Sequence, residues 1–218
     1  MAVALFDLDN TLLAGDSDYL WGTFLVEQGI VDGDYYETEN NRFYQEYKDG
    51  VLDIYEFLRF SLRPLRENDP ATLQHLREAF LRQCIDPIIP DASRRLIAKH
   101  REAGDELIII TATNSFVTHP IAQRLGVRHL IATEPEIIEG RYTGNVAGEP
   151  CFREGKVKRL HQWLAEYRMN LQASWFYSDS HNDIPLLEEV DNPVAVDPDE
   201  ILSELARRRG WPEISLRG

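Results

Sequence analysis

The residues with the clearest chemical potential in this 218-residue chain are two aspartates one position apart, Asp7 and Asp9. They follow directly on the apolar run Val3-Ala4-Leu5-Phe6, which is typical of a buried strand. Carboxylates at the end of such a strand cost free energy unless a cation or a reaction uses them. The carboxyl ends of strands are also where α/β sheets place their active sites. The pair is therefore the centre of a candidate site.

Other polar residues follow the ends of further predicted strands. Thr111 and Asn114 come after the apolar run 106–110, and Asp179 follows the run that ends at Tyr177. Lys156 opens a predicted helix before that last strand. In a parallel sheet these ends lie along one edge, so we expect residues far apart in the sequence to converge there.

Four carboxylates would meet at this edge, from Asp7, Asp9, Asp179 and Asp183. Each pair repels by roughly 4 kcal/mol at about 4 Å if the effective dielectric constant is about 20. A bound cation is therefore expected. Oxygen ligands, completed by water and a substrate phosphate, favour Mg²⁺ over zinc or a closed calcium site.

The set predicts phosphoryl transfer. Asp7 can attack phosphorus and form an aspartyl-phosphate, which divides one difficult displacement into two easier ones. Asp9 can protonate the leaving oxygen and then activate water for the second step. Thr111 and Lys156 can bind the phosphate oxygens on which charge must be stabilised.

Supporting roles fall to the neighbouring polar residues. Asp179 with the metal can position and neutralise the phosphate, while Asn182 and Asp183 hold the metal shell and Lys156 in place. Arg153 precedes Lys156 in a loop near the site, and a role in binding substrate or phosphate is a hypothesis for it.

The elements that must position these residues alternate between apolar strands and helices after Pro90, which indicates parallel βαβ units. We predict a five-stranded parallel sheet with a small hairpin at 137–145, turning at Glu139-Gly140. The predicted strands span 3–6, 106–110, 129–132, 174–177 and 193–196, and the helices 91–103, 115–125, 156–167, 184–189 and 198–209.

The stretch 16–88 has a different hydrophobic pattern, with apolar and aromatic residues at helical spacing. We predict three or four amphipathic helices there, separated by glycines and by the segment from Pro64 to Pro70. Length and a hydrophobic content of 43% fit one α/β domain with an insertion. The predicted division is a catalytic core, 1–15 and 89–218, and a helical cap, 16–88.

Charge and composition argue against several classes of partner. The net charge of −14 repels nucleic acid and anionic membrane surfaces. No apolar run has the length of a membrane span, and the apolar start lacks a basic segment typical of a signal peptide. Cys84 and Cys151 lack the spacing of a zinc site. We expect a cytoplasmic protein that acts on a small molecule; its oligomeric state stays open.

Four ordered segments of the chain resemble the motifs of the haloacid dehalogenase superfamily of phosphatases. They are Asp7-Leu8-Asp9-Asn10-Thr11, Ile-Thr-Ala-Thr-Asn around Thr111, Glu-Gly-Lys at Lys156, and Ser178-Asp179-Ser180-His181-Asn182-Asp183. The helical insertion after the first strand resembles the small C1-type cap of the subgroup with phosphoserine phosphatase, subfamily IB. The resemblance therefore implies a Rossmann-like α/β core with this cap.

The resemblance also implies individual roles. Asp7 would be the nucleophile and Asp9 the general acid/base, and the Asp7 side chain, the Asp9 backbone carbonyl and Asp179 would bind Mg²⁺. Family members with other chemistries carry other residues at the position of Asp9, so phosphomonoester hydrolysis or transfer is favoured.

The substrate expected from the resemblance is an amino-alcohol phosphate such as histidinol phosphate. The opening and closing segments of the chain resemble a bacterial branch that includes histidinol-phosphate phosphatases. Asp16 takes the position of a cap glutamate that binds the substrate ammonium in phosphoserine phosphatase, and Arg59 is the nearest match to the arginine that binds the serine carboxylate. Asn114 is a further candidate for substrate binding.

Three alternatives stay open at this point. The first is phosphoserine phosphatase, although the segment Thr111-Ala112-Thr113 departs from its serine and glycines. The second is a phosphotransferase of the same family. The third is a non-enzymatic phospho-accepting regulatory module, which the helical insertion and the early position of Asp7 argue against.

Overall fold

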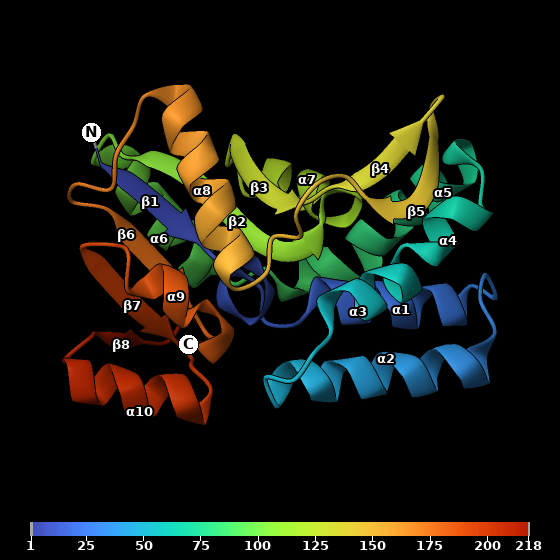
Figure 1. Cartoon of the computed structure of the whole chain (residues 1–218), viewed down its shortest axis with the longest axis horizontal. Coiled ribbons are helices and arrows are strands. Elements are labelled where there is room, and N and C mark those ends of the chain that lie inside the picture. The colour runs from blue at the N-terminus through green and yellow to red at the C-terminus, as the bar shows by residue number, and fades with distance from the viewer. Residues whose placement is uncertain (1, 218) are drawn as a thin grey trace.

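The computed structural model describes residues 2–217; Met1 and Gly218, which the predicted core includes, lie outside the described residues. A six-stranded parallel sheet forms its centre, with strand order β3-β2-β1-β6-β7-β8 (Figure 1). The predicted α/β fold is thus confirmed. The strands are β1 (Val3–Phe6), β2 (Glu106–Asn114), β3 (His129–Thr133), β6 (Trp175–Ser178), β7 (Asn192–Val196) and β8 (Glu213–Ile214).

Both faces of the sheet are buried, as the continuous apolar runs predict. Side chains of β1 alternate between two cores: Ala4 and Phe6 belong to one, and Val3 and Leu5 to the other. Helices α6 (Asp91–Glu102) and α7 (Ser115–Arg124) cover the first face. Helices α8 (Glu154–Tyr167), α9 (Ile184–Leu187) and α10 (Glu200–Arg209) cover the second. Strand β1 therefore lies inside the sheet, between β2 and β6, with a core on each face.

The stretch between β1 and α6 is helical, as predicted, but it forms five α-helices rather than three or four, besides short π- and 3₁₀-helical segments at 8–12, 81–85 and 86–88. The five α-helices are α1 (Ser17–Glu27), α2 (Gly33–Lys48), α3 (Ile54–Ser61), α4 (Arg63–Glu67) and α5 (Pro70–Phe80). Helix α4 occupies part of the segment predicted as a break, because a proline is tolerated in the first turn of a helix. Helices α1, α2, α3 and α5 each follow an aspartate whose side chain accepts backbone N–H bonds.

The predicted hairpin consists of β4 (Pro135–Ile138) and β5 (Arg141–Val146). Its turn falls at Glu139 and Gly140, which both have positive φ, as a type I′ hairpin turn requires. Strand β5 lies against α4, where Gly144 approaches the side chain of Arg66 (Figure 1). The hairpin therefore contacts the helical insertion, although the predicted boundaries assign it to the core. The division into core and cap stays a proposal.

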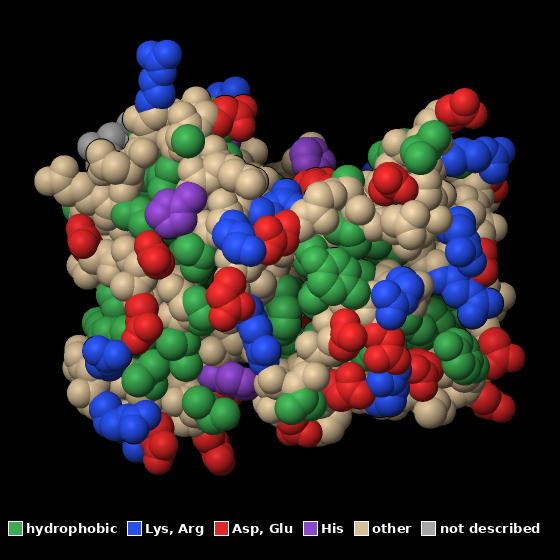
Figure 2. All heavy atoms as spheres, viewed as in Figure 1, with side chains coloured by type: hydrophobic (Ala, Val, Ile, Leu, Met, Phe, Trp, Pro, Cys, Tyr) green, Lys and Arg blue, Asp and Glu red, His purple; other side chains and the backbone are tan. Residues whose placement is uncertain are grey.

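The visible surface reflects the acidic composition. In Figure 2, Asp and Glu side chains gather over α2 and α3, where Arg42 pairs with Glu39, Glu46 and Glu56. Among residues 2–217, no helix combines the length and apolarity needed to cross a membrane.

Candidate active site

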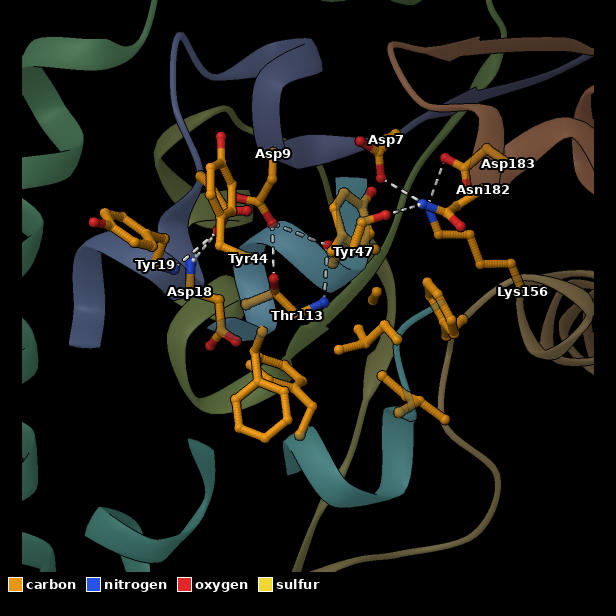
Figure 3. Close-up of a pocket in the computed structure, with 18 of the residues that line it drawn as sticks. Asp7, Asp9, Asp18, Tyr19, Tyr44, Tyr47, Thr113, Lys156, Asn182 and Asp183 are labelled. Atoms are coloured by element: carbon orange, nitrogen blue, oxygen red, sulfur yellow. Dashed lines mark hydrogen bonds and ion pairs between the residues drawn. The ribbon is translucent and has the colours of Figure 1, made fainter. Parts of the chain in front are cut away.

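The sheet order brings the predicted site residues together. Strand β1 lies between β2 and β6, so the segments that follow these three strands are neighbours. One pocket is lined by seven of the predicted residues: Asp7, Asp9, Asp16, Thr111, Lys156, Asn182 and Asp183 (Figure 3). Thr111 lies inside β2 rather than after it, because that strand continues to Asn114.

Asp7 is fixed by its backbone and by a buried lysine. Its N–H donates to the Tyr177 carbonyl at 2.9 Å, which continues the pairing of β1 with β6. The Lys156 ammonium donates to Asp7 Oδ1 at 2.7 Å and to Asp183 Oδ2 at 2.7 Å (Figure 3). Ser178 also donates to Asp183 Oδ2, at 2.7 Å. Lys156 therefore ties the nucleophile candidate to the loop after β6.

Burial governs the ionisation of this group. It raises the pKa of Asp7 to about 7, although the Lys156 ammonium opposes the shift. For Lys156, burial lowers the pKa, but the carboxylates of Asp183 and Asp7 outweigh burial and raise the pKa above its usual value. Lys156 is thus a permanent positive charge between two carboxylates.

Asp9 accepts hydrogen bonds from two directions. Its Oδ1 accepts the Ser17 N–H at 2.6 Å, and its Oδ2 accepts the hydroxyls of Thr113 at 2.8 Å and Thr111 at 3.4 Å. Burial, with the nearby Asp16 carboxylate, raises the pKa of Asp9 to about 6. A carboxyl group with a pKa near neutrality can both give and take a proton, which an acid/base must do.

The hydroxyl of Thr11 links Asp7 to Asp179. The residue types of the sequence did not predict this contact. Its hydroxyl lies 3.2 Å from Asp7 Oδ2 and 3.1 Å from Asp179 Oδ1, and it accepts the Asp179 N–H at 3.0 Å. Burial, and then the charge of Asp7, raise the pKa of Asp179 well above its usual value. Two carboxylates are therefore held side by side through one hydroxyl. The only sequence signal for Thr11 is its place in the first motif.

The atoms near Asp7 and Asp179 that could bind a metal ion are hard oxygen atoms. In residues 2–217, no group of three or more His, Cys, Asp and Glu side chains is placed to hold a metal ion. Asp7 and Asp179 supply two carboxylates, and the third protein ligand that the family resemblance implies is the backbone carbonyl of Asp9. Few protein oxygens, completed by water and phosphate, suit Mg²⁺.

The four residues predicted to bind substrate differ in their position relative to the pocket. They are Asp16, Asn114, Arg153 and Arg59. Asp16 lines the pocket, and its Oδ1 accepts the N–H groups of Asp18 and Tyr19 at 2.9 Å each, so it also caps α1. Asn114 lies outside the lining and caps α7, where its Oδ1 accepts the Val117 N–H at 3.3 Å.

The two arginines do not line the pocket. Arg59 is exposed on α3, because the helical period turns its neighbours Leu58 and Phe60 inward. Arg59 therefore does not line this pocket, and a contact of Arg59 with the substrate stays a prediction. Arg153 lies beside the pocket, and its Nε donates to Asn182 Oδ1 at 2.9 Å. Its contacts are to protein groups rather than to the space where a substrate would lie.

The rest of the lining is aromatic, apolar and acidic. Asp18, which sequence reasoning missed, accepts one long hydrogen bond, from Asn114 at 3.4 Å. Figure 3 shows it on the far side of Thr113 from Lys156. Burial, and then the charges of Asp16 and Asp9, raise the pKa of Asp18 well above its usual value. The ring and aliphatic lining residues are Tyr19, Phe43, Tyr44, Tyr47, Leu52, Ile54, Phe57 and Phe152.

Charge is distributed unevenly in this pocket. Lys156 is the single Lys or Arg among the described lining residues, and it is already paired with Asp7 and Asp183. Asp16 and Asp18 have no basic partner among the salt bridges of the described residues. A ligand with a positive group beside Asp18 and a phosphate beside Lys156 matches this distribution.

Comparison with known proteins places the chain in a family. The model of the haloacid dehalogenase-like hydrolases matches residues 4–188. A histidinol-phosphatase from Neisseria meningitidis serogroup C (strain 8013) is 43% identical over 219 residues, with 99% of each chain covered.

Solved structures agree with this placement. A protein with unknown function from Bordetella pertussis Tohama I has a TM-score of 0.93 and 45% identity, covering 99% of this chain and 98% of that one. A phospho-aspartyl intermediate analogue of phosphoserine phosphatase shares the fold, with a TM-score of 0.71, 19% identity, and coverage of 100% and 93%. The chain therefore belongs to the haloacid dehalogenase-like hydrolase family, as its motifs predict.

Proposed function

We propose that this phosphatase is a Mg²⁺-dependent phosphomonoesterase that acts through an aspartyl-phosphate at Asp7, with histidinol phosphate as its substrate. The observation that carries the proposal is the pocket itself. Asp7 and Lys156 lie on one side of it, and Asp18, which has no basic partner among the salt bridges of the described residues, lies beside Tyr19 on the far side of Thr113 (Figure 3).

In the first step, an Asp7 carboxylate oxygen attacks phosphorus while the ester P–O bond breaks. The leaving alkoxide takes the proton of Asp9, whose pKa of about 6 makes the acid form available near neutrality. The Lys156 ammonium, 2.7 Å from Asp7 Oδ1, lies where it can stabilise charge on the transferring phosphoryl group, and the Thr111 hydroxyl can donate to it.

In the second step, water attacks the phosphorus of the aspartyl-phosphate and the acyl-phosphate P–O bond breaks. Asp9, now a carboxylate, takes the proton of that water, which restores its acid form. Thr113, which donates to Asp9 Oδ2 at 2.8 Å, holds the carboxyl in place through both steps. The products are inorganic phosphate and the alcohol.

Mg²⁺ would be held by the Asp7 and Asp179 carboxylates and the Asp9 carbonyl, and it would supply charge neutralisation for the phosphate. Asn182 and Asp183 support the site through their bonds to Arg153 and Lys156. Their positioning keeps the lysine directed at Asp7.

Metal binding should depend on pH through Asp7. In the metal-free protein, burial raises the pKa of Asp7 from 3.8 to about 7, so this group makes folding less favourable as pH rises between those values. A ligand carboxylate must lose its proton, so we expect Mg²⁺ to raise the unfolding temperature more at about pH 8 than at about pH 5.5. Thermal unfolding of wild type and of Asp179→Asn, which should respond weakly at both values, measures this. An equal shift of the wild type at both pH values would contradict the assignment.

The charges of the pocket favour an amino alcohol over an amino acid. Histidinol phosphate carries an ammonium and an imidazole, and it has no carboxylate. The carboxylate of phosphoserine would face Asp16 and Asp18 with no free lysine or arginine among the described lining residues. The name of the 43% identical Neisseria relative, histidinol-phosphatase, supports the same choice.

Substitution of Asp18 tests this choice. A charged hydrogen bond contributes about 1.5–3 kcal/mol, so Asp18→Asn should lower kcat/KM for histidinol phosphate by about 10- to 100-fold. The loss should fall mainly on KM, and p-nitrophenyl phosphate, which has no cation, should lose less than about threefold. Asp34→Asn, at an exposed position of α2, is the matched control. Better turnover of phosphoserine than of histidinol phosphate by the wild type would overturn the substrate assignment.

A further inference from the structure

Three hydrogen bonds, made by two side chains and two backbone carbonyls, connect the helical insertion to the catalytic loops. Arg153 Nε donates to Asn182 Oδ1 at 2.9 Å, and Arg153 Nη2 donates to the Gly50 carbonyl. Asn182 Nδ2 donates to the Tyr47 carbonyl at 3.1 Å. We call this set the Arg153 bridge. It joins the end of α2, which Figure 1 shows turned toward the middle of the molecule, to the loops before α8 and after β6.

The bridge begins at a residue with an unusual backbone. Arg153 has φ 50° and ψ −122°, a region that costs a residue with a side chain about 1–3 kcal/mol. Such a conformation persists only where surrounding contacts hold it. Its carbonyl accepts the Lys156 N–H at 2.9 Å, so the conformation of Arg153 sets the first turn of α8, on which Lys156 stands.

The other side of the bridge is equally constrained. Gly50 has φ +68°, and a Cβ there would lie 2.8 Å from His181 Nε2 and 3.3 Å from Arg153 Nη2. His181 is itself held by Asp199, whose Oδ2 accepts the His181 N–H at 2.7 Å and lies 2.7 Å from Nδ1. The insertion can therefore approach the core this closely only with a glycine at position 50.

We propose that Arg153 is a positioning residue that couples the seating of the helical insertion over the pocket to the placement of Lys156 and Asn182. When the insertion is seated, the Gly50 carbonyl and Asn182 both satisfy the guanidinium, and the strained turn before α8 is held. When the insertion moves away, the guanidinium loses Gly50, and Asn182 loses the Tyr47 carbonyl. Phosphoryl transfer is thereby confined to the closed pocket, from which bulk water is excluded.

This inference rests on the proposed role of Lys156 in binding phosphate, and it replaces the sequence hypothesis that Arg153 contacts the substrate. Two of its guanidinium nitrogens are already engaged by protein oxygens. The residue is also absent from the lining of the pocket. It acts on the reaction through other residues.

The test combines turnover with hydrogen exchange in the intact protein. With p-nitrophenyl phosphate and Mg²⁺, we expect Arg153→Ala to lower kcat by at least about tenfold and to change KM by less than about threefold. Exchange of the backbone amides at 47–52 should become at least about tenfold faster, with β1 and β2 unchanged. Arg153→Lys should restore little, because a single ammonium does not reproduce the fork of two donors. Arg159→Ala, which removes another α8 arginine bonded to the Glu149 carbonyl, should resemble wild type.

A second variant tests whether Gly50 and Arg153 act through the same set of contacts. Gly50→Ala should lower kcat by itself. The kcat of the double variant with Arg153→Ala should be no lower than that of the less active single variant, because both substitutions break the same bridge. Losses that multiply would overturn the proposal. So would a tenfold rise in KM with kcat retained, which would assign Arg153 to substrate binding. Hydrogen exchange is measured without substrate turnover. An inactive wild type would therefore count against the proposed function, while the exchange rates of the amides at 47–52 would still test whether the Arg153 bridge holds the insertion.

Discussion

Asp7→Asn should release phosphate from histidinol phosphate at least about 10⁴-fold more slowly than wild type, because the asparagine amide cannot act as the nucleophile. Steady-state phosphate release with Mg²⁺ present measures the effect. Asp34→Asn serves again as the exposed control. Turnover within about tenfold of wild type would remove Asp7 from the chemistry.

The same variant should keep its fold. Burial raises the pKa of Asp7 to about 7, so at higher pH the folded state holds this carboxylate at a cost. Asparagine removes that charge, and Lys156 keeps its 2.7 Å contact with Asp183. We therefore expect no fall in the unfolding temperature of the metal-free protein at about pH 8. A large fall would mean that inactivity reports unfolding rather than lost chemistry.

Lys156→Met should be the most destabilising single change at the site. Lys156 is 3% exposed and lies between two carboxylates, and its removal leaves Asp7 and Asp183 buried without a counter-charge. Breaking a buried ion pair from one side costs about 3–5 kcal/mol of unfolding free energy. Catalysis should also fall, by about 10²- to 10³-fold, because a charge that stabilises the phosphoryl group is lost.

Urea unfolding at two pH values measures the stability part of this prediction. The destabilisation should be smaller at about pH 5.5 than at about pH 8, because Asp7 can then take a proton. Lys158→Met, at a lysine that is 60% exposed and pairs with Glu149 at the surface, should change the unfolding free energy by less than about 1 kcal/mol. An equal effect of the two lysine substitutions would contradict the role given to the Lys156 charge.

The fold is largely predictable from the sequence because the strands are continuous apolar runs bounded by polar residues. Strand β1, for example, ends where Phe6 gives way to Asp7. Strand β8 escaped prediction, since Glu213 and Ile214 are too few to show a period. The additional helix α4 escaped it too, because Pro64 reads equally well as a break or as a helix start.

The half of the site that is proposed to bind phosphate is predictable from the sequence, and the half proposed to bind the rest of the substrate is less so. Asp7 follows β1 and Thr111 lies in the neighbouring strand β2, so strand order brings these two together, while Lys156 reaches them from the first turn of α8. The placement of Asp18 and Arg59 depends instead on how α1 and α3 turn against the core, which no local pattern specifies. The hydrogen bonds of the Arg153 bridge likewise depend on how the helical insertion packs against the core. No local sequence pattern predicts them.

The covalent intermediate is the most direct test of the central claim, that Asp7 receives the phosphoryl group of a phosphate ester. Wild-type enzyme turning over histidinol phosphate with Mg²⁺ can be quenched in acid, and its peptides can be weighed by mass spectrometry. The account predicts one added phosphoryl group on the peptide that contains Asp7, and none in Asp7→Asn. A phosphoryl group on any other residue, or rapid hydrolysis by Asp7→Asn, would contradict it.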